Sequence, residues 1–263
     1  MRVILTRPER EARSWLTTLA QAGIQALALP LIAVDGPPDP LAVQRVWQQL
    51  GQFDAAMFVS GNAVDQFYAL KPAVAPVEYA QAAIKMRAFV TGPGTRSALL
   101  RHGVAAHLID VPDAQTGQWD SEALWAVVQS QVRPGFKLLI VRGADADRTQ
   151  PHGAGRDWFA QQVLARGGLV EFVVAYQRRC PTFPSAQLAD AQSAAVDGSV
   201  WLFSSSEAIG NLQRVLPDQS WHQARAVATH PRIAQAAREA GFGVVCESRP
   251  LLADVVASIE SMP

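Results

Sequence analysis

Two hydrophobicity patterns alternate along the chain. Short apolar runs rich in branched side chains lie between longer runs in which apolar residues recur at helical spacing. In the first such pair, residues 2–6 form the apolar run, Pro8 follows where a helix can begin, and apolar residues at i, i+3, i+4 and i+7 lead from Ala12 to Leu19 before Gly23. Strands that alternate with helices almost from end to end are typical of parallel sheets, so the sequence predicts an α/β fold.

The other expected strands share these features, and helices are expected between most of them. Their ranges are 24–29, 55–59, 86–90, 137–141, 169–175, 200–203, 224–228 and 244–246.

Two irregular, proline-rich junctions interrupt the alternation. "DGPPDP" at 35–40 and "RRCPTFP" at 178–184 each follow an apolar, extended run. Such junctions are natural hinges between domains. If the chain crosses between domains at both, a middle α/β domain (36–177) is inserted into a discontinuous α/β domain made of residues 1–35 plus 178–263.

An internal comparison favours this organisation. Three pairs of segments, each at the end of an expected strand, are similar in compatible order, and one pair places Arg7 opposite Arg142. The pairs are "FVSGNAV" (58–64) with "FSSSEAI" (203–209), "TGPGTRSALLRHG" (91–103) with "THPRIAQAAREAG" (229–241), and "ILTRP" (4–8) with "LIVRG" (139–143). Each similarity is weak, and chance resemblance is the alternative.

Composition and charge narrow the class of protein. The 263 residues are 49% hydrophobic, as in a globular protein with a core, and the 23 Lys and Arg residues balance the 23 Asp and Glu residues. This balance gives no overall positive field to attract nucleic acid. Cys180 and Cys246 fit neither a disulfide framework nor a metal cluster. No segment approaches a signal peptide or the roughly 18 apolar residues of a membrane span, so we expect a cytoplasmic protein without a membrane partner.

Small, hydroxyl-bearing and arginine residues gather where the expected strands end. Ligands of open parallel sheets bind beyond the carboxyl ends of the strands, and backbone N–H groups at helix N-termini favour anions. We therefore expect two facing sheets to form an anion-binding cleft, although capping of helices alone is the alternative for each Ser, Thr or Asn. The expected lining is Thr6, Arg7, Ser60, Asn62, 91–95 with Gly92 and Thr95, Arg142, Gly143, 204–206 with Ser205 and Ser206, and 229–232 with His230 and Arg232.

Other chemistries find little support. "TGPGT" has neither the spacing of a dinucleotide motif nor the end of a P-loop, which favours a carboxylate ligand over a nucleotide. Asp145 and Asp147 in "RGADADR" could indicate Mg²⁺, but a solvated loop is the preferred interpretation. The histidines lack ligand spacing, and a G-x-S-x-G elbow is absent, so we expect no metal and no serine nucleophile. Tyr176 ends the strand at the second crossing, where its hydroxyl could reach the cleft or its ring could cover a hinge.

The motifs, taken in order, resemble the uroporphyrinogen-III synthase family across essentially the whole chain. No single motif is very specific, but the ordered series is. The motifs are "LTRP", "VSGNAV", "VTGPGTRSALLRHGV", "SEALWAVV", "LLIVRGADADR", "VVAYQRR" and "LFSSSEAI", followed by a late helix that ends in glycine.

This resemblance implies two small, flavodoxin-like parallel-sheet domains joined by a two-stranded connection, with the active site between them and no cofactor. The implied enzyme is a lyase that cyclises hydroxymethylbilane to uroporphyrinogen III, with loss of water and inversion of ring D, in tetrapyrrole (heme) biosynthesis. Each pyrrole of this substrate carries an acetate and a propionate, so the expected anions are carboxylates. Transient handover from hydroxymethylbilane synthase is the further partner implied, and nothing in the sequence demands more than a monomer.

The resemblance also assigns individual residues. Tyr176 matches the family's tyrosine and could donate a proton to the departing hydroxyl group, whereas Thr95 matches a threonine assigned to substrate binding. At the late helix, where the family often has a second Gly-x-x-Thr, Ile233 stands at the threonine position. Hydroxyl-based binding is in doubt there, and Arg232 could supply charge instead.

The sequence leaves two alternative functions open. One is a non-catalytic, two-lobed module that closes on a small polyanion. The other is a nucleotide-dependent α/β transferase, which the missing glycine motif disfavours.

Overall fold

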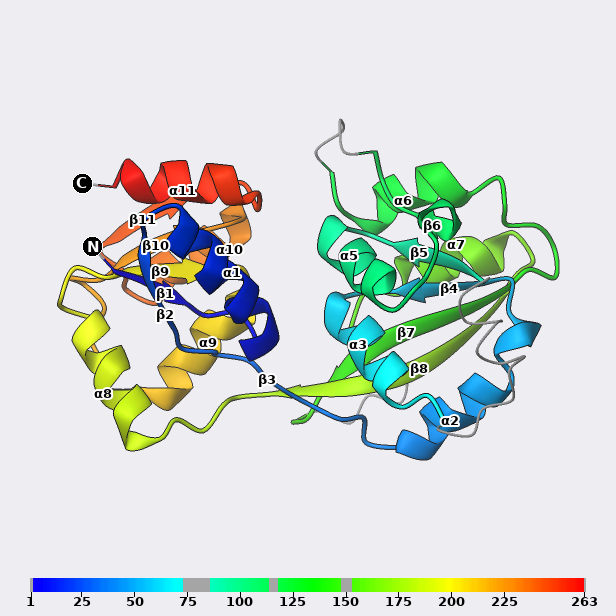
Figure 1. Cartoon of the computed structure of the whole chain (residues 1–263), viewed down its shortest axis with the longest axis horizontal. Helices are drawn as coiled ribbons and strands as arrows, with labels where there is room; N and C mark the ends of the chain where they lie inside the picture. The colour runs from blue at the N-terminus through cyan, green and yellow to red at the C-terminus, as the bar shows by residue number, and fades with distance from the viewer. Residues whose placement is uncertain (1, 73–85, 114–117, 148–152, 263) are drawn as a thin grey trace. The chain divides into compact units, whose positions relative to one another are not determined.

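The chain forms two compact α/β units with parallel sheets. The structure is a computed structural model that describes residues 2–72, 86–113, 118–147 and 153–262 (Figure 1). Unit 1 comprises Met1–Ala33 and Arg179–Pro263, and unit 2 comprises Val34–Arg178. The predicted α/β class, with one segment inserted into another, is confirmed.

Unit 1 contains a five-stranded parallel sheet in the order β11-β10-β9-β1-β2. Numbered along this unit alone, the order is 2-1-3-4-5, which is that of flavodoxin-like folds. The strands are β1 (Arg2–Leu5), β2 (Gln25–Ala28), β9 (Val200–Phe203), β10 (Arg225–Ala228) and β11 (Val244–Glu247). The helices are α1 (Glu9–Gln21), α8 (Ser185–Ala194), α9 (Ser206–Val215), α10 (Pro231–Glu239) and α11 (Leu252–Glu260).

Unit 2 contains a six-stranded sheet in the order β3-β8-β7-β4-β5-β6, and its pairings from β8 to β6 are parallel. The strands are β3 (Ala33–Asp35), β4 (Ala55–Phe58), β5 (Arg87–Val90), β6 (Ile109–Asp110), β7 (Lys137–Asp145) and β8 (Leu169–Arg179). The helices are α2 (Pro40–Gln48), α3 (Gly61–Ala69), α5 (Pro93–Arg101), α6 (Ser121–Val128) and α7 (Trp158–Ala165), with the short 3₁₀ helices η1 (Leu50–Gln52) and η2 (Ala106–Leu108).

Both boundaries between the units cut neighbouring strands. One boundary falls within β3, after Ala33, and the other falls near the end of β8, after Arg178. Because β3 and β8 are adjacent in the sheet of unit 2, the connection is the two-stranded one that was predicted.

The two sheets have the same strand order when unit 2 is numbered from β7. Strands β8-β7-β4-β5-β6 then correspond to β2-β1-β9-β10-β11. The register agrees, since Val3 pairs with Val200 in one sheet and Leu138 pairs with Ala55 in the other. Arg7 comes four residues after Val3, and Arg142 comes four residues after Leu138. The weak internal similarity in the sequence therefore reflects a structural equivalence.

Strand alternation places an apolar core on each face of both sheets. In β9, Trp201 and Phe203 face the core that α8, α9 and α10 cover, whereas Val200 and Leu202 face the core beneath α1 and α11. In unit 2 the corresponding cores lie beneath α2, α3 and α5 on one face and beneath α6 and α7 on the other. Helices thus cover both faces of each sheet and leave the carboxyl ends of the strands at its edge.

The structure differs from the predicted elements mainly around β7 and β8. Both strands continue beyond their expected ends, and the short strands β3 and β6 were not predicted. The solvated loop expected from Arg142 onward is therefore wrong in its first part: β7 runs to Asp145, whose carboxylate pairs with Arg178 of β8 at 2.5 Å. Pairing with a neighbouring strand, which a local hydrophobicity pattern does not contain, extends both strands.

Candidate functional site

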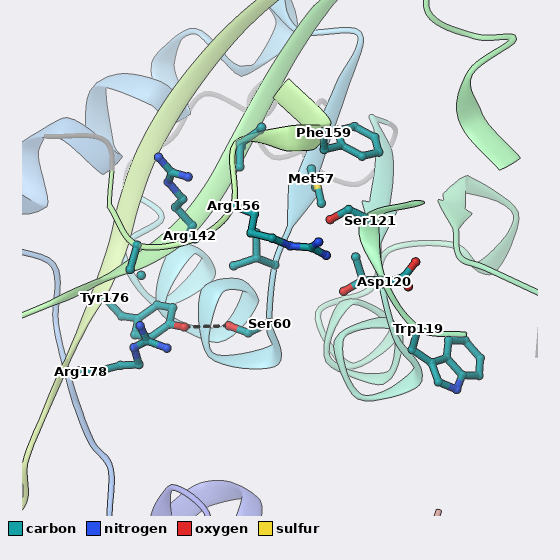
Figure 2. Close-up of a pocket in the computed structure, with 16 residues that line it drawn as sticks. Met57, Ser60, Trp119, Asp120, Ser121, Arg142, Arg156, Phe159, Tyr176 and Arg178 are labelled. Atoms are coloured by element: carbon teal, nitrogen blue, oxygen red, sulfur yellow. Dashed lines mark hydrogen bonds between the residues drawn. The ribbon is translucent and has the colours of Figure 1, made fainter. Parts of the chain in front are cut away.

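A pocket of about 400 Å³ lies in unit 2, where strands β4, β5, β7 and β8 end (Figure 2). One wall comes from these strand ends, and the other comes from the start of α6 and from the segment that leads into α7. The lining residues are Met57, Val59, Ser60, Thr91, Ile140, Arg142, Gly143, Tyr176 and Arg178 on the first wall, and Trp119, Asp120, Ser121, Ala154, Gly155, Arg156 and Phe159 on the second.

A β-bulge sets the position of Tyr176. Arg142 pairs with Val174 and Gly143 pairs with Tyr176, so Ala175 is an extra residue in β8. Side chains on a regular strand alternate between faces, yet Ala175 and Tyr176 both pack into the same apolar core. The bulge therefore keeps the tyrosine ring in the core beneath α2, α3 and α5, at the carboxyl edge of the sheet, where Tyr176 also lines the pocket.

The ring of Tyr176 lies directly against the backbone of Gly143. A Cβ atom added to Gly143 would lie within 3.0 Å of three carbons of this ring. Only glycine has the space for such a contact. The tyrosine is 5% exposed, and its hydroxyl oxygen is 3.1 Å from Ser60 Oγ, with either group able to donate (Figure 2).

Ser60 has two roles in the local structure. It is the N-cap of α3, and its Oγ accepts a hydrogen bond from the backbone N–H of Ala63 at 3.1 Å. The same oxygen contacts the Tyr176 hydroxyl. Capping was the alternative to binding that the sequence left open, and the geometry shows that this serine caps the helix and also contacts a pocket residue.

Replacing Ser60 should separate these two roles. Ser60→Ala removes the cap, so we expect the free energy of unfolding to fall by about 1 kcal/mol. It also removes the partner that orients the phenol, which should lower kcat by roughly 2- to 10-fold, the equivalent of one ordinary hydrogen bond. Chemical denaturation and steady-state kinetics measure the two effects.

The equivalent cap in unit 1 provides the comparison for stability. Ser205 caps α9 by accepting from the backbone N–H of Glu207 at 3.1 Å, and Ser205→Ala should cost about the same free energy. An unchanged kcat in Ser60→Ala would show that its hydrogen bond does not orient Tyr176.

Arg142 brings a buried positive charge to the pocket. Its side chain is 3% exposed, its Nη1 donates to Asp157 Oδ1 at 2.8 Å, and its Cζ lies 4.1 Å from the centre of the Phe172 ring. Burial of an unpaired charge is costly, so the carboxylate and the aromatic face stabilise the guanidinium in this position.

Two further arginines line the same pocket. Arg156 forms a two-pronged ion pair with Glu122 at 3.0 and 3.2 Å, and Arg178 pairs with Asp145 at 2.5 Å. In Figure 2 the Arg156 side chain extends toward Ser121. The carboxylates that pair with Arg142, Arg156 and Arg178 are not part of the pocket lining. Three arginines therefore line the pocket, and each pairs with a carboxylate outside the lining, an arrangement suited to an anionic ligand.

The predicted residues of unit 1 lie at the carboxyl edge of its own sheet. Thr6 is 1% exposed and donates to the carbonyl of Leu202 at 2.7 Å, which ties β1 to β9. Arg7 pairs with Glu11 at 3.4 Å and lies over the ring of Trp15 at 4.6 Å. Burial lowers the pKa of Arg7, and the neighbouring Glu11 carboxylate opposes this shift.

Helices α9 and α10 carry the remaining predicted residues of unit 1. Ser206 is the first residue of α9. His230 is the N-cap of α10, and its Nδ1 accepts from the backbone N–H of Arg232 at 3.1 Å. Arg232 is exposed, and Ile233, at the family's threonine position, is 5% exposed in the core.

The structure brings together five of the residues expected to line the site, namely Ser60, Thr91, Arg142, Gly143 and Tyr176, in one pocket. Three others of unit 2 do not line it. Gly92 is the N-cap of α5, Thr95 is 7% exposed within that helix, and Asn62 lies in the first turn of α3. Their roles, and the expected contribution of both units to one site, stay predictions.

Sequence reasoning missed one wall of the pocket. Asp120 caps α6 by accepting from the backbone N–H of Ala123 at 2.8 Å, so "DSEAL" was a recognisable helix start. This helix start was not expected to follow a strand, because the preceding strand, β6, has only two residues. Arg156 follows Gly153 and Gly155, whose φ angles of +78° and +143° are a sign of a tight turn after β7.

Within the described ranges, no cluster of three or more His, Cys, Asp or Glu residues could hold a metal ion.

The chain is similar to known proteins in sequence and in fold. The family model described as "Uroporphyrinogen-III synthase HemD" matches residues 14–257. The fold is similar to that of the uroporphyrinogen-III synthetase from Helicobacter pylori 26695, with a TM-score of 0.60 at 15% identity over 100% of both chains. It is also similar to a mutant uroporphyrinogen III synthase from the extremely thermophilic bacterium Thermus thermophilus, with a TM-score of 0.54 at 16% identity over 100% of both chains.

Proposed function

Because the chain belongs to the uroporphyrinogen-III synthase family, we propose that it cyclises hydroxymethylbilane to uroporphyrinogen III, with inversion of ring D and loss of water, in tetrapyrrole biosynthesis. In class terms the reaction is that of a cyclising hydro-lyase. The observation that carries this proposal is the pocket of unit 2, which is lined by three arginines and by a buried tyrosine whose hydroxyl contacts Ser60.

Departure of the substrate hydroxyl group is the first bond-breaking step. The pyrrole nitrogen supplies electrons as the C–O bond breaks, and the oxygen leaves as water once it receives a proton. Tyr176 is suited to donate this proton because its hydroxyl lies in the pocket, and Ser60, 3.1 Å away, orients it. A phenol is a weak acid at neutral pH, so its contribution to the rate is limited.

Orientation of the substrate supplies the larger part of catalysis. After the hydroxyl group has left, the bilane closes without help to the symmetric isomer, so the protein must hold ring D such that its bridge-bearing carbon is attacked first. That attack gives a spiro intermediate, and rearrangement of the bridge then inverts the ring. Holding reactants in one geometry accelerates such a step without strong acids or bases.

The protein fixes the orientation of the substrate by binding its carboxylate groups. The substrate's acetate and propionate groups are anions, and Arg142, Arg156 and Arg178 line the pocket in which Tyr176 lies. A guanidinium group can bind a carboxylate through two parallel hydrogen bonds, which fixes direction as well as distance. We assign the same binding role to the other predicted residues, which are Thr6, Arg7, Ser60, Asn62, Gly92, Thr95, Gly143, Ser205, Ser206, His230 and Arg232.

The wider proposals concern organisation and partners. We propose that residues 1–35 plus 178–263 and residues 36–177 are the two domains, and that the protein works in the cytoplasm, where hydroxymethylbilane synthase hands over the substrate. Cys180 and Cys246 are both free cysteines in the structure. In the part of the chain that the structure describes, helices long and apolar enough for a membrane span are absent.

An isomer assay tests the proposed reaction. Hydroxymethylbilane is generated from porphobilinogen by hydroxymethylbilane synthase, the protein is added, and the products are oxidised to uroporphyrins and separated. We expect mainly the type III isomer, against type I in the control without this protein. Type I alone in the presence of the protein would reject the synthase activity. Binding of the bilane without turnover would favour the alternative function, a non-catalytic polyanion-binding module.

A further inference from the structure

Arg7 is a largely buried cation with incomplete hydrogen bonding. Its side chain is 15% exposed, and its ion pair, from Nη1 to Glu11 Oε2, is long at 3.4 Å. Its Nε is shielded from water and has no hydrogen-bond partner among the described residues. A buried donor without an acceptor destabilises a fold, so such a group calls for an explanation.

The equivalent arginine of unit 2 shows what a satisfied environment looks like. Arg142 occupies the same strand position, and it pairs with Asp157 at 2.8 Å rather than 3.4 Å. Each arginine also lies over an aromatic ring, at 4.1 Å for Arg142 and 4.6 Å for Arg7. Both arginines thus contact a carboxylate and an aromatic ring. In unit 1, however, the Glu11 carboxylate lies farther from the guanidinium and satisfies it less well.

A second group without a partner lies at the same edge of the same sheet. Ser206 Oγ is buried and has no hydrogen-bond partner among the described residues. Ser206 begins α9, directly after β9, and Arg7 follows β1. Strands β1 and β9 are neighbours, and the Thr6 hydroxyl bonds across them to Leu202. A cation and a hydroxyl group, both short of partners, therefore stand at adjoining strand ends.

We propose that Arg7 and Ser206 form a carboxylate subsite of unit 1 that binds one acetate or propionate group of the substrate, an inference that rests on the proposed function. The Nε–Nη2 edge of the guanidinium, opposite the Glu11 contact, offers the two parallel donors that a carboxylate accepts. Because Nε is shielded in this conformation, the guanidinium turns outward when the carboxylate binds. Ser206 adds a third donor.

The desolvation of Arg7 supports this assignment. Burial lowers its pKa, which means that the surroundings disfavour the charged form in the absence of a ligand. A bound carboxylate would supply the missing counter-charge. The residue is thus held at a cost to the ligand-free protein, as expected for a residue kept for binding.

Arg7→Met provides the test, because methionine keeps an apolar stem against Trp15 and removes the charge. We expect KM for hydroxymethylbilane to rise about tenfold or more, the equivalent of a charged hydrogen bond, while the melting temperature stays the same or rises. Ser206→Ala should raise KM by roughly 2- to 10-fold. A purely structural arginine would instead lower the melting temperature when replaced and leave KM unchanged.

Arg13→Met is the matched control. Arg13 lies on α1, the helix that carries Glu11, and pairs with Glu9 at 2.6 Å, but its side chain is 75% exposed. This variant should keep the wild-type KM and melting temperature. A KM for Arg7→Met within twofold of the wild type, or a clear fall in its melting temperature, would overturn the subsite.

A binding measurement separates this inference from the proposed function. Sodium sulfate, titrated at constant ionic strength, should raise the melting temperature of the wild type more than that of Arg7→Met. Equal responses would argue against an anion site at Arg7, whether or not the protein is active. A wild type that produces only type I uroporphyrinogen would reject the synthase activity, and the sulfate comparison would still decide whether Arg7 binds anions.

Discussion

Gly143→Ala should lower kcat/KM by about 10²-fold or more, although it adds only one methyl group. The new Cβ would lie within 3.0 Å of three ring carbons of Tyr176, so the ring must move. Movement of the ring takes the hydroxyl away from Ser60 and from the pocket. The substitution therefore removes the proposed proton donor and also fills space at the strand end, which removal of the hydroxyl alone does not do.

The same clash should lower the free energy of unfolding by about 1–3 kcal/mol, the usual range for overpacking. Backbone strain is not the cause, because Gly143 is not among the glycines with positive φ. Chemical denaturation and steady-state kinetics on the same preparations measure both effects.

Gly210→Ala is the matched control for this substitution. Gly210 lies within α9, and an added Cβ would meet nothing within 4 Å. Alanine is the better helix former, so this variant should be more stable than the wild type by about 0.5–1 kcal/mol. Wild-type stability and activity in Gly143→Ala would show that Tyr176 is not held against this glycine in solution.

Tyr176→Phe should lower kcat by about 10²-fold or less while KM changes little. Phenylalanine keeps the ring against Gly143 and in the apolar core, so the melting temperature should stay close to that of the wild type. Only the hydroxyl is lost. The limited effect follows from the weakness of a phenol as an acid at neutral pH and from the electron-rich pyrrole, which assists departure of the hydroxyl group.

The isomer that Tyr176→Phe forms distinguishes acid catalysis from orientation. With protein in excess over hydroxymethylbilane, the product should remain type III, because the carboxylate-binding residues still hold the chain. Type I as the main product under these conditions would mean that Tyr176 itself directs ring closure. A loss of kcat well above 10²-fold would mean that proton transfer contributes more than proposed.

Much of the fold could be predicted because its signals are local. The apolar run before Ser60, the capping serine and the apolar face of α3 are adjacent in the sequence, and the equivalent run before Ser205 repeats them. The ends of β4 and β9 could therefore be located within one residue. Since the strands are parallel, residues such as Ser60 and Arg142 were expected at one edge, and the pocket contains both.

The rest of the site depends on contacts between distant residues. The sequence around Ala175 shows nothing unusual, since the bulge exists only relative to β7, and this bulge decides where Tyr176 points. The pairing of Arg156 with Glu122 joins positions 34 residues apart, and neither residue type predicts its partner. The local hydrophobicity pattern also gave no sign that β7 and β8 extend beyond their apolar runs.

The permuted strand order has a consequence for the history of the chain. Among the described elements, and apart from β3, strands alternate with helices, and strands 1-2-3-4-5 of the flavodoxin order occur once in β1, β2, β4, β5 and β6 and again in β7 to β11. Read in this way, the chain contains two consecutive copies of one strand order. The first two strands of each copy have joined the last three of the other, which is a domain swap within one polypeptide. Either copy alone contains all five strands of a flavodoxin-like sheet.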